Sequence, residues 1–174
     1  MTFPASYPAA LPIPPEARLL APQSACDFVD CRGIWLPGEM SALQGWNAVM
    51  AEPIPGLALA FKLRDWVSTR FGVKPIGGFS TKSTQRVAAG DKLDFFLVEE
   101  VTPQRLLLSE RDRHLDVLTC ITAVAQGSGT RLTITSSVVT HNGFGRVYMW
   151  PVGPGHKLLV SFMLRRLKKR FSTS

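Results

Sequence analysis

A histidine and an aspartate two positions apart, His114 and Asp116, are candidates for chemistry. They stand in an alternating segment, so in an extended strand both side chains point to one face, about 7 Å apart. A histidine and a carboxylate at that distance could share a small ligand or a water, or act together in general acid–base catalysis. The alternative is a hydrogen-bonded pair that only fixes the sheet.

A second polar cluster runs from His141 to Met149. His141 and Asn142 end a predicted strand just before a glycine, which favours turn geometry over ligand binding. Arg146 and Tyr148 alternate onto one side of the chain, where the guanidinium could clamp a carboxylate or phosphate through two hydrogen bonds. The alternative is that Arg146 stacks on Tyr148 or caps a strand end. The ligand-binding candidates are therefore His114, Asp116, His141, Asn142, Arg146 and Tyr148.

The sequence predicts neither a metal centre nor a bound cofactor, and it assigns no catalytic residue. The three histidines lack an accompanying carboxylate set, and no His–Cys cluster has zinc spacing. No GxGxxG motif follows a strand, so no dinucleotide site is expected. Cys26, Cys31 and Cys120 are an odd number without a CxxC pair, which is typical of buried free thiols in a reducing compartment.

The elements that must position these residues begin with a strand predicted over residues 25–36. Ser41 and Gln44 have the spacing of a capping box, which opens a short helix through Met50. Prolines and a glycine end that helix, and an apolar stripe predicts a second helix over residues 57–71.

The rest of the sequence predicts antiparallel strands and a terminal helix. A run around Phe95 to Val101 turns into a return strand over residues 105–110, and residues 113–126 and 131–141 form a long hairpin. Both hairpin strands have an apolar face and a mixed face, as expected where one face meets a core and the other lines a partly polar cavity or meets water. A helix is predicted over residues 154–171. The fold class is therefore α+β, with a curved antiparallel sheet, two short helices and a long C-terminal helix.

Proline and charge are both unevenly distributed. Residues 1–22 carry six of the 13 prolines, so we expect an extended or disordered arm that could lie along the surface of a single domain over residues 23–174. The net charge of +7 is entirely C-terminal: residues 117–174 hold eight basic residues and no acidic one. The basic run over residues 165–170 reads as a solvated helix end, or alternatively as a membrane or nucleic-acid contact. No secretory signal or spanning segment is predicted, so we expect a cytoplasmic protein.

The segments His114-Leu115-Asp116, His141-Asn142, Gly145-Arg146-Val147-Tyr148 and Val152 to His156 together resemble the bacterial family known as domain of unknown function 2867. The resemblance covers roughly residues 26–168. That family is similar to the START-like (SRPBCC) superfamily, whose helix-grip fold encloses a cavity between the sheet and the terminal helix. The resemblance implies this fold and an apolar or amphipathic small ligand, but no reaction.

Three functions follow as hypotheses. The first is a START-like domain that binds a hydrophobic or amphipathic small molecule between the sheet and the C-terminal helix. The second is a small-molecule enzyme, such as a cyclase, dehydratase or hydrolase, that uses His114 and Asp116 with Arg146 orienting the substrate. The third is a module that binds a membrane or nucleic-acid surface through its basic terminal helix, although no nucleic-acid motif supports the nucleic-acid version.

Overall fold

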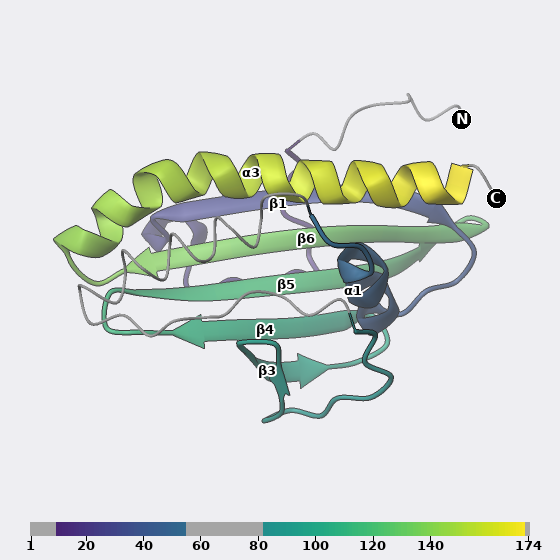
Figure 1. Ribbon diagram of the computed structural model, residues 1–174, viewed down its shortest axis with the longest axis horizontal. Coiled ribbons are helices and arrows are strands. Elements are labelled where there is room, and N and C mark those ends of the chain that lie inside the picture. The colour runs from purple at the N-terminus through teal and green to yellow at the C-terminus, as the bar shows by residue number, and fades with distance from the viewer. Residues whose placement is uncertain (1–9, 55–81, 173–174) are drawn as a thin grey trace.

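One six-stranded antiparallel sheet organises the molecule (Figure 1). The computed structural model describes residues 10–54 and 82–172. The strands lie in the order β1-β6-β5-β4-β3-β2, so β1 and β2 form the two edges. Their bounds are β1 Phe28–Pro37, β2 Lys92–Leu93, β3 Phe96–Val101, β4 Arg105–Arg111, β5 Leu115–Gln126 and β6 Gly129–Thr140.

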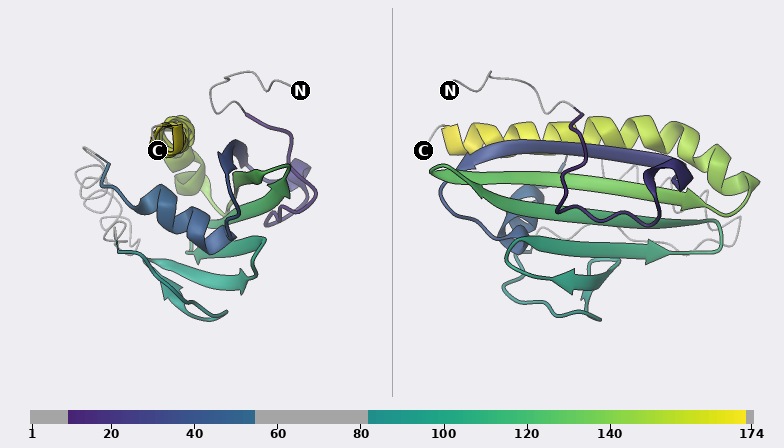
Figure 2. Two further views of the ribbon diagram at one scale, coloured as in Figure 1. Left: turned by 90° about the vertical axis from the view of Figure 1, so that its right-hand side faces the viewer. Right: turned by 180° about the vertical axis from the view of Figure 1, so that it is seen from behind.

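Two helices, α1 (Ala42–Met50) and α3 (Gly143–Ser172), lie on the same side of the curved sheet (Figure 2). A short 3-10 turn, η1, covers Gln23–Ala25. The predicted α+β class, the curved antiparallel sheet and the long C-terminal helix are confirmed. The second short helix, predicted over residues 57–71, lies outside the described residues.

The capping box of α1 forms as the sequence predicted. The Ser41 hydroxyl accepts a hydrogen bond from the Gln44 backbone N–H, and the Gln44 side chain accepts one from the Ser41 N–H. These two bonds satisfy backbone donors that a helix start leaves without an intrahelical partner. Gly45 lets α1 approach the sheet closely, since a Cβ there would lie 2.4 Å from a methyl carbon of Leu132.

The core fills the space between the sheet and the two helices. Alternation along the strands places Ile121 and Ala123 of β5 and Leu132 and Ile134 of β6 on this face. Tight burial of large aliphatic side chains is the main source of stability in such a layer. The core side chains with no exposed surface are Leu36, Ala42, Val98, Leu106, Leu108, Leu132 and Leu164.

The N-terminal segment covers the middle of the opposite, mixed face of the sheet (Figure 2). Ala17 and Leu20 pack on a small second cluster formed by Leu107, Leu118 and Cys120. The Leu20 N–H donates to the Ser137 hydroxyl at 3.1 Å, and the Arg18 N–H donates to the Cys120 Sγ at 3.4 Å. The N-terminal residues therefore pack on part of the mixed face; the sequence allowed an arm along the surface of the domain but did not indicate this face.

The long helix α3 begins at Gly143, eleven residues before the predicted start at Pro154. The Asn142 side chain accepts a hydrogen bond from the Gly145 N–H at 3.0 Å and caps the helix start. Pro151 and Pro154 lie inside the helix and remain exposed. Each removes one intrahelical donor, and the helix curves over its first half (Figure 1).

Candidate functional site

A groove of about 560 Å³ opens between the first half of α3 and the adjoining ends of β1 and β6. Its size falls within the range of small-molecule binding sites in proteins. The helix contributes both charged and apolar side chains, and the strand ends close the other side. The lining residues are Asp27, Phe28, Thr140, Arg146, Val147, Met149, Trp150, Gly153, Pro154 and Lys157.

The wall of the groove is mostly apolar and aromatic. The Lys157 Nζ lies over the Phe28 ring, 5.4 Å from its centroid, and the His156 ring meets Phe28 edge-on at 5.7 Å between centroids. Gly153 gives Phe28 room, because a Cβ there would lie 3.2 Å from the ring. Trp150 stands at the rim with 84% of its surface exposed. An aromatic side chain in that position offers a large contact area to a ligand at low conformational cost.

Charges stand at the mouth of the groove. The Asp27 carboxylate accepts hydrogen bonds from the Thr140 N–H at 2.7 Å and the Thr140 hydroxyl at 2.9 Å. These bonds, with the positive charge of Arg146 nearby, lower the pKa of Asp27 below its usual range. Asp27 also lines the groove, but its carboxylate is hydrogen-bonded to Thr140, and the two exposed cations Arg146 and Lys157 outnumber it there. The groove therefore combines an apolar wall with two positive charges, which suits an amphipathic anion.

A buried polar group lies on the sheet beneath α3. The Arg32 Nε donates to the Asp30 carboxylate at 2.8 Å, with only 3% of the Asp30 side chain and 14% of the Arg32 side chain exposed. The Arg32 Nη1 also donates to the Ser161 hydroxyl of α3 at 2.7 Å. This group ties strand β1 to the helix that forms one wall of the groove.

His156 belongs to the same region of α3. Burial lowers the pKa of its imidazole below the ordinary value, and the nearby positive charges of Arg32 and Lys157 act in the same direction. The Asp30 carboxylate opposes this shift but does not outweigh it. His156 is therefore neutral near pH 7, and its ring is an aromatic neighbour of Phe28 rather than a third cation.

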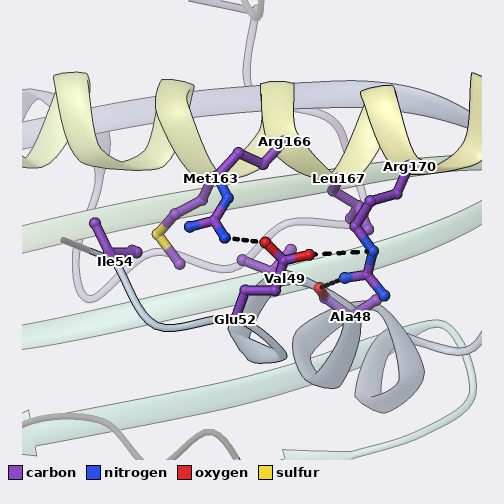
Figure 3. A pocket seen from close by; sticks show the side chains of 8 residues that line it. All are labelled: Ala48, Val49, Glu52, Ile54, Met163, Arg166, Leu167 and Arg170. Carbon is purple, nitrogen blue, oxygen red and sulfur yellow. Dashed lines mark hydrogen bonds and ion pairs between the residues drawn. The ribbon is translucent and has the colours of Figure 1, made fainter.

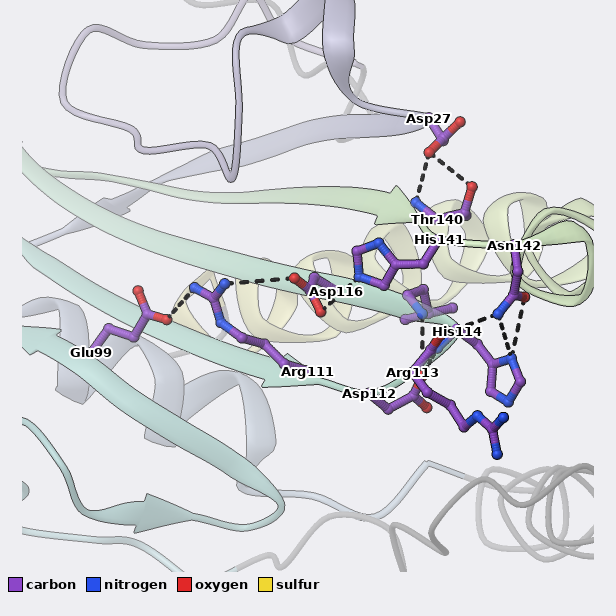
Figure 4. A network of polar contacts seen from close by, with 11 residues as sticks. Asp27, Glu99, Arg111, Asp112, Arg113, His114, Asp116, Thr140, His141 and Asn142 are labelled. Carbon is purple, nitrogen blue, oxygen red and sulfur yellow. Dashed lines mark hydrogen bonds and ion pairs between the residues drawn. The ribbon is translucent and has the colours of Figure 1, made fainter.

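The predicted candidates divide into separate pairs (Figure 4). Asp116 lies 3.1 Å from the His141 Nε2 and 3.5 Å from a guanidinium nitrogen of Arg111. Alternation places Asp116 on the mixed face, with Leu118 and Cys120. Arg111 also pairs with Glu99 at 2.9 Å, which lowers the pKa of that carboxyl group. These contacts form a partly exposed ionic network across neighbouring strands.

His114 has different partners from Asp116. Its Nδ1 lies 3.0 Å from the Asn142 side-chain nitrogen and 3.2 Å from the Asn142 oxygen, and its ring contacts Phe144 at 4.7 Å between centroids. Asn142 also donates to the Arg113 carbonyl. His114 is buried, and its pairing with Asn142 joins the beginning of β5 to the start of α3. Each of the two residues predicted to act together thus has its own structural partner.

The prediction that Arg146 and Tyr148 share one side of an extended chain is wrong. Both lie in the first turns of α3, where residues two apart differ by about 200° around the helix axis. Arg146 lines the groove, whereas the Tyr148 ring stacks with Phe144 at 6.2 Å between centroids. Of the six candidates, only Arg146 lines this groove.

A second, much smaller cavity of about 10 Å³ lies between α1 and the C-terminal half of α3 (Figure 3). That volume holds no more than one water. Glu52 pairs here with both Arg166 and Arg170, and these arginines also donate to the carbonyls of Pro53 and Ala48. Two arginines of the basic run therefore connect α3 to the end of α1, whereas the sequence predicted a helix end in solvent.

Sequence reasoning missed two groups of residues, the ion pair on β1 and most of the residues that line the groove. Asp30 and Arg32 are two positions apart in an otherwise apolar strand, so their side chains share one face. Opposite charges at that spacing in a buried segment were a usable signal of an internal ion pair. Asp27, Phe28, Trp150 and Lys157 offered no comparable signal, because their meeting depends on the β1–β6 pairing and on where α3 begins.

Comparison with known proteins gives one family match. The model of the family described as "Protein of unknown function (DUF2867)" matches residues 23–163, which is most of the chain. No curated protein matches it. Within residues 10–54 and 82–172, no group of three or more His, Cys, Asp or Glu residues has an arrangement that could hold a metal ion. No helix in the same part of the chain is long and apolar enough to cross a membrane.

Proposed function

From the premise that the chain belongs to the DUF2867 family, we propose that it is a START-like domain that binds an amphipathic small molecule carrying an anionic group. The groove between α3 and the ends of β1 and β6 is the proposed site. The observation that carries the proposal is the combination, in one groove of about 560 Å³, of an apolar aromatic wall with the cations Arg146 and Lys157. The free thiols Cys26, Cys31 and Cys120 fit our proposal that the protein works in the cytoplasm.

Two regions of the groove would bind the two parts of the ligand. A carboxylate or phosphate would lie between Arg146 and Lys157, where two cations replace part of its hydration. The apolar body would lie along Phe28 and Met149 and under the exposed Trp150 ring. A purely apolar ligand would pair with neither cation, so we expect the anionic group to be required for tight binding.

Displacement of a fluorescent fatty-acid probe tests the proposal. The probe should bind the intact protein, and an uncharged ester of the same chain length should compete poorly. Lys157→Gln and Trp150→Ala should each weaken probe binding about tenfold, since the first removes one of the two cations and the second removes the exposed aromatic contact. Arg113→Gln removes an exposed arginine outside the groove and is the matched control. Equal competition by ester and acid, or equal loss in the control, would overturn the proposal.

Native mass spectrometry of protein purified from cells gives an independent test. A co-purifying amphipathic anion that is lost from the Lys157→Gln variant supports the groove as its site. A ligand retained by that variant and by Trp150→Ala would place the binding elsewhere. The enzymatic alternative stays a prediction, and the separate pairings of His114 and Asp116 do not favour it.

A further inference from the structure

The solvent side of α3 carries large apolar side chains. Four of them are exposed: Val147 by 69%, Trp150 by 84%, Leu158 by 73% and Phe162 by 44%. Their spacing along the helix brings them onto one broad side, and the exposed Pro154 lies between them. We call these four residues the outer stripe. Single exposed apolar residues are common, but a row of them along one helix marks an interaction surface.

The charge of α3 is of one sign. The helix contains seven basic residues and no acidic one, as its sequence shows. Arg166 and Arg170 pair with Glu52 of the α1 side. Arg146 is exposed at the start of the outer stripe and Lys157 beside Leu158, and Arg165 and Lys169 are exposed beyond its end. Exposed cations thus stand at the start of the outer stripe, beside Leu158, and beyond its end.

We propose that α3 docks on the surface of an anionic lipid membrane, with the outer stripe inserted among the headgroups and the flanking cations on the lipid phosphates and carboxylates. An apolar helix face flanked by Lys and Arg, with a tryptophan at its edge, is the pattern of helices that lie in the membrane interface. Each basic side chain near an anionic leaflet adds to the attraction. The inference does not rest on the groove binding a ligand.

Charge complementarity favours a lipid membrane over two other partners, a second copy of the chain and a nucleic acid. A second copy of the chain packing through the same stripe would bring two helices of the same sign together, which like-charge repulsion opposes. A nucleic acid would satisfy the cations but offers no apolar surface for Val147 and Leu158, which would stay in water. A lipid interface provides both an apolar layer and a negative surface.

Sedimentation with lipid vesicles tests the proposal. The full chain should bind vesicles of phosphatidylcholine mixed with phosphatidylserine and bind phosphatidylcholine alone at least tenfold more weakly. Raising the salt concentration should weaken binding to the mixed vesicles, because salt screens the charges. Absence of binding, or equal binding to both kinds of vesicle, would overturn the proposal.

Two double variants separate the apolar and electrostatic parts. Leu158→Ser with Phe162→Ser should lower the vesicle partition coefficient about tenfold or more, since both side chains are exposed and should leave the fold intact. Leu97→Ser on β3, 37% exposed, is the matched control. Loss in the control equal to that in the double variant would overturn the role of the stripe.

The charge variant is Arg165→Gln with Lys169→Gln, which should reduce binding to the mixed vesicles about tenfold. Lys92→Gln, at the opposite edge of the sheet, is its control. Far-UV circular dichroism and thermal unfolding should match the unchanged protein for all four variants. A dimer formed through the outer stripe, or tighter binding to duplex DNA than to anionic vesicles, would assign the surface to another partner and overturn the proposal.

Discussion

Replacing Asp30 with asparagine tests how much the buried ion pair on β1 contributes to holding α3 against the sheet. The change removes the negative charge that the Arg32 Nε contacts at 2.8 Å. Arg32 would keep its hydrogen bond to Ser161, but its largely buried guanidinium would lose the Asp30 carboxylate. Removing one partner of such a pair costs about 3–5 kcal/mol in free energy of unfolding. That is a large part of the roughly 5–15 kcal/mol that stabilises an ordinary domain.

A double variant separates the cost of leaving one buried charge unpaired from the net contribution of the ion pair to the free energy of unfolding. Asp30→Leu with Arg32→Met replaces both charges with apolar groups of similar size, so no buried charge is left uncompensated. Its stability should lie within about 2 kcal/mol of the unchanged protein, because buried pairs gain little net energy over a packed apolar replacement. Ser161 would still donate to the Lys157 carbonyl, so its hydroxyl would keep a partner.

Urea unfolding followed by circular dichroism measures both effects. The midpoint should fall for Asp30→Asn and largely recover in the double variant, with an unchanged slope in each. Lys92→Gln is the control, because its side chain is 63% exposed and lies 3.7 Å from Glu110. Such a surface pair contributes about 0–1 kcal/mol. A loss below about 1 kcal/mol for Asp30→Asn, or a double variant as unstable as the single one, would refute the reasoning.

Three further predictions concern other contacts of the helices. His156→Gln should make the free energy of unfolding less dependent on pH below neutrality. The pKa of His156 is lowered in the folded protein, so the unfolded chain takes up the proton first and stability falls as the pH drops through the ordinary value of 6.5. Urea unfolding at pH 7.5 and 5.5 measures this, and an equal drop in both proteins would contradict it. Gly145→Ala should destabilise by about 2–4 kcal/mol, because its Cβ would lie 2.3 Å from the His114 carbonyl oxygen; an unchanged thermal midpoint would rule out this close approach. Glu52→Gln should cost about 1 kcal/mol or less and loosen α1, since its partners Arg166 and Arg170 are partly exposed; hydrogen exchange in α1 that stays unchanged would argue against the clamp.

The elements whose positions depend on residues close together in the sequence were predictable. The start of α1 depends on Ser41 and Gln44, three positions apart, and both bonds of the capping box form. The long hairpin follows from strict alternation on both sides of a glycine turn, and its register pairs Leu118 with Ser137 as the two mixed faces require. In these cases the local pattern and the tertiary packing favour the same structure.

The start of α3 was not predictable from local signals, because Pro151 and Pro154 disfavour a helix interior. Packing outweighs this preference: Gly145 and Gly153 are buried, and the Asn142 cap joins the helix to His114. The prediction that His114 and Asp116 act together failed for a related reason. Whether Asp116 meets His114 or His141 is decided by strand register and by the direction the chain takes after β6.

The contact between the N-terminal segment and strand β1 bears on how the molecule avoids aggregation. β1 is an edge strand, and an open edge is a template for pairing with another chain. Here Ala10 forms a bridge with Arg32, and the Leu11 N–H donates to the Cys31 carbonyl at 2.8 Å. Pro12, Pro14 and Pro15 lack N–H donors, so the pairing cannot continue as a regular ladder beyond Leu11. The segment therefore covers the part of the β1 edge at Cys31 and Arg32, and a chain without it would leave that part open to pairing with another strand.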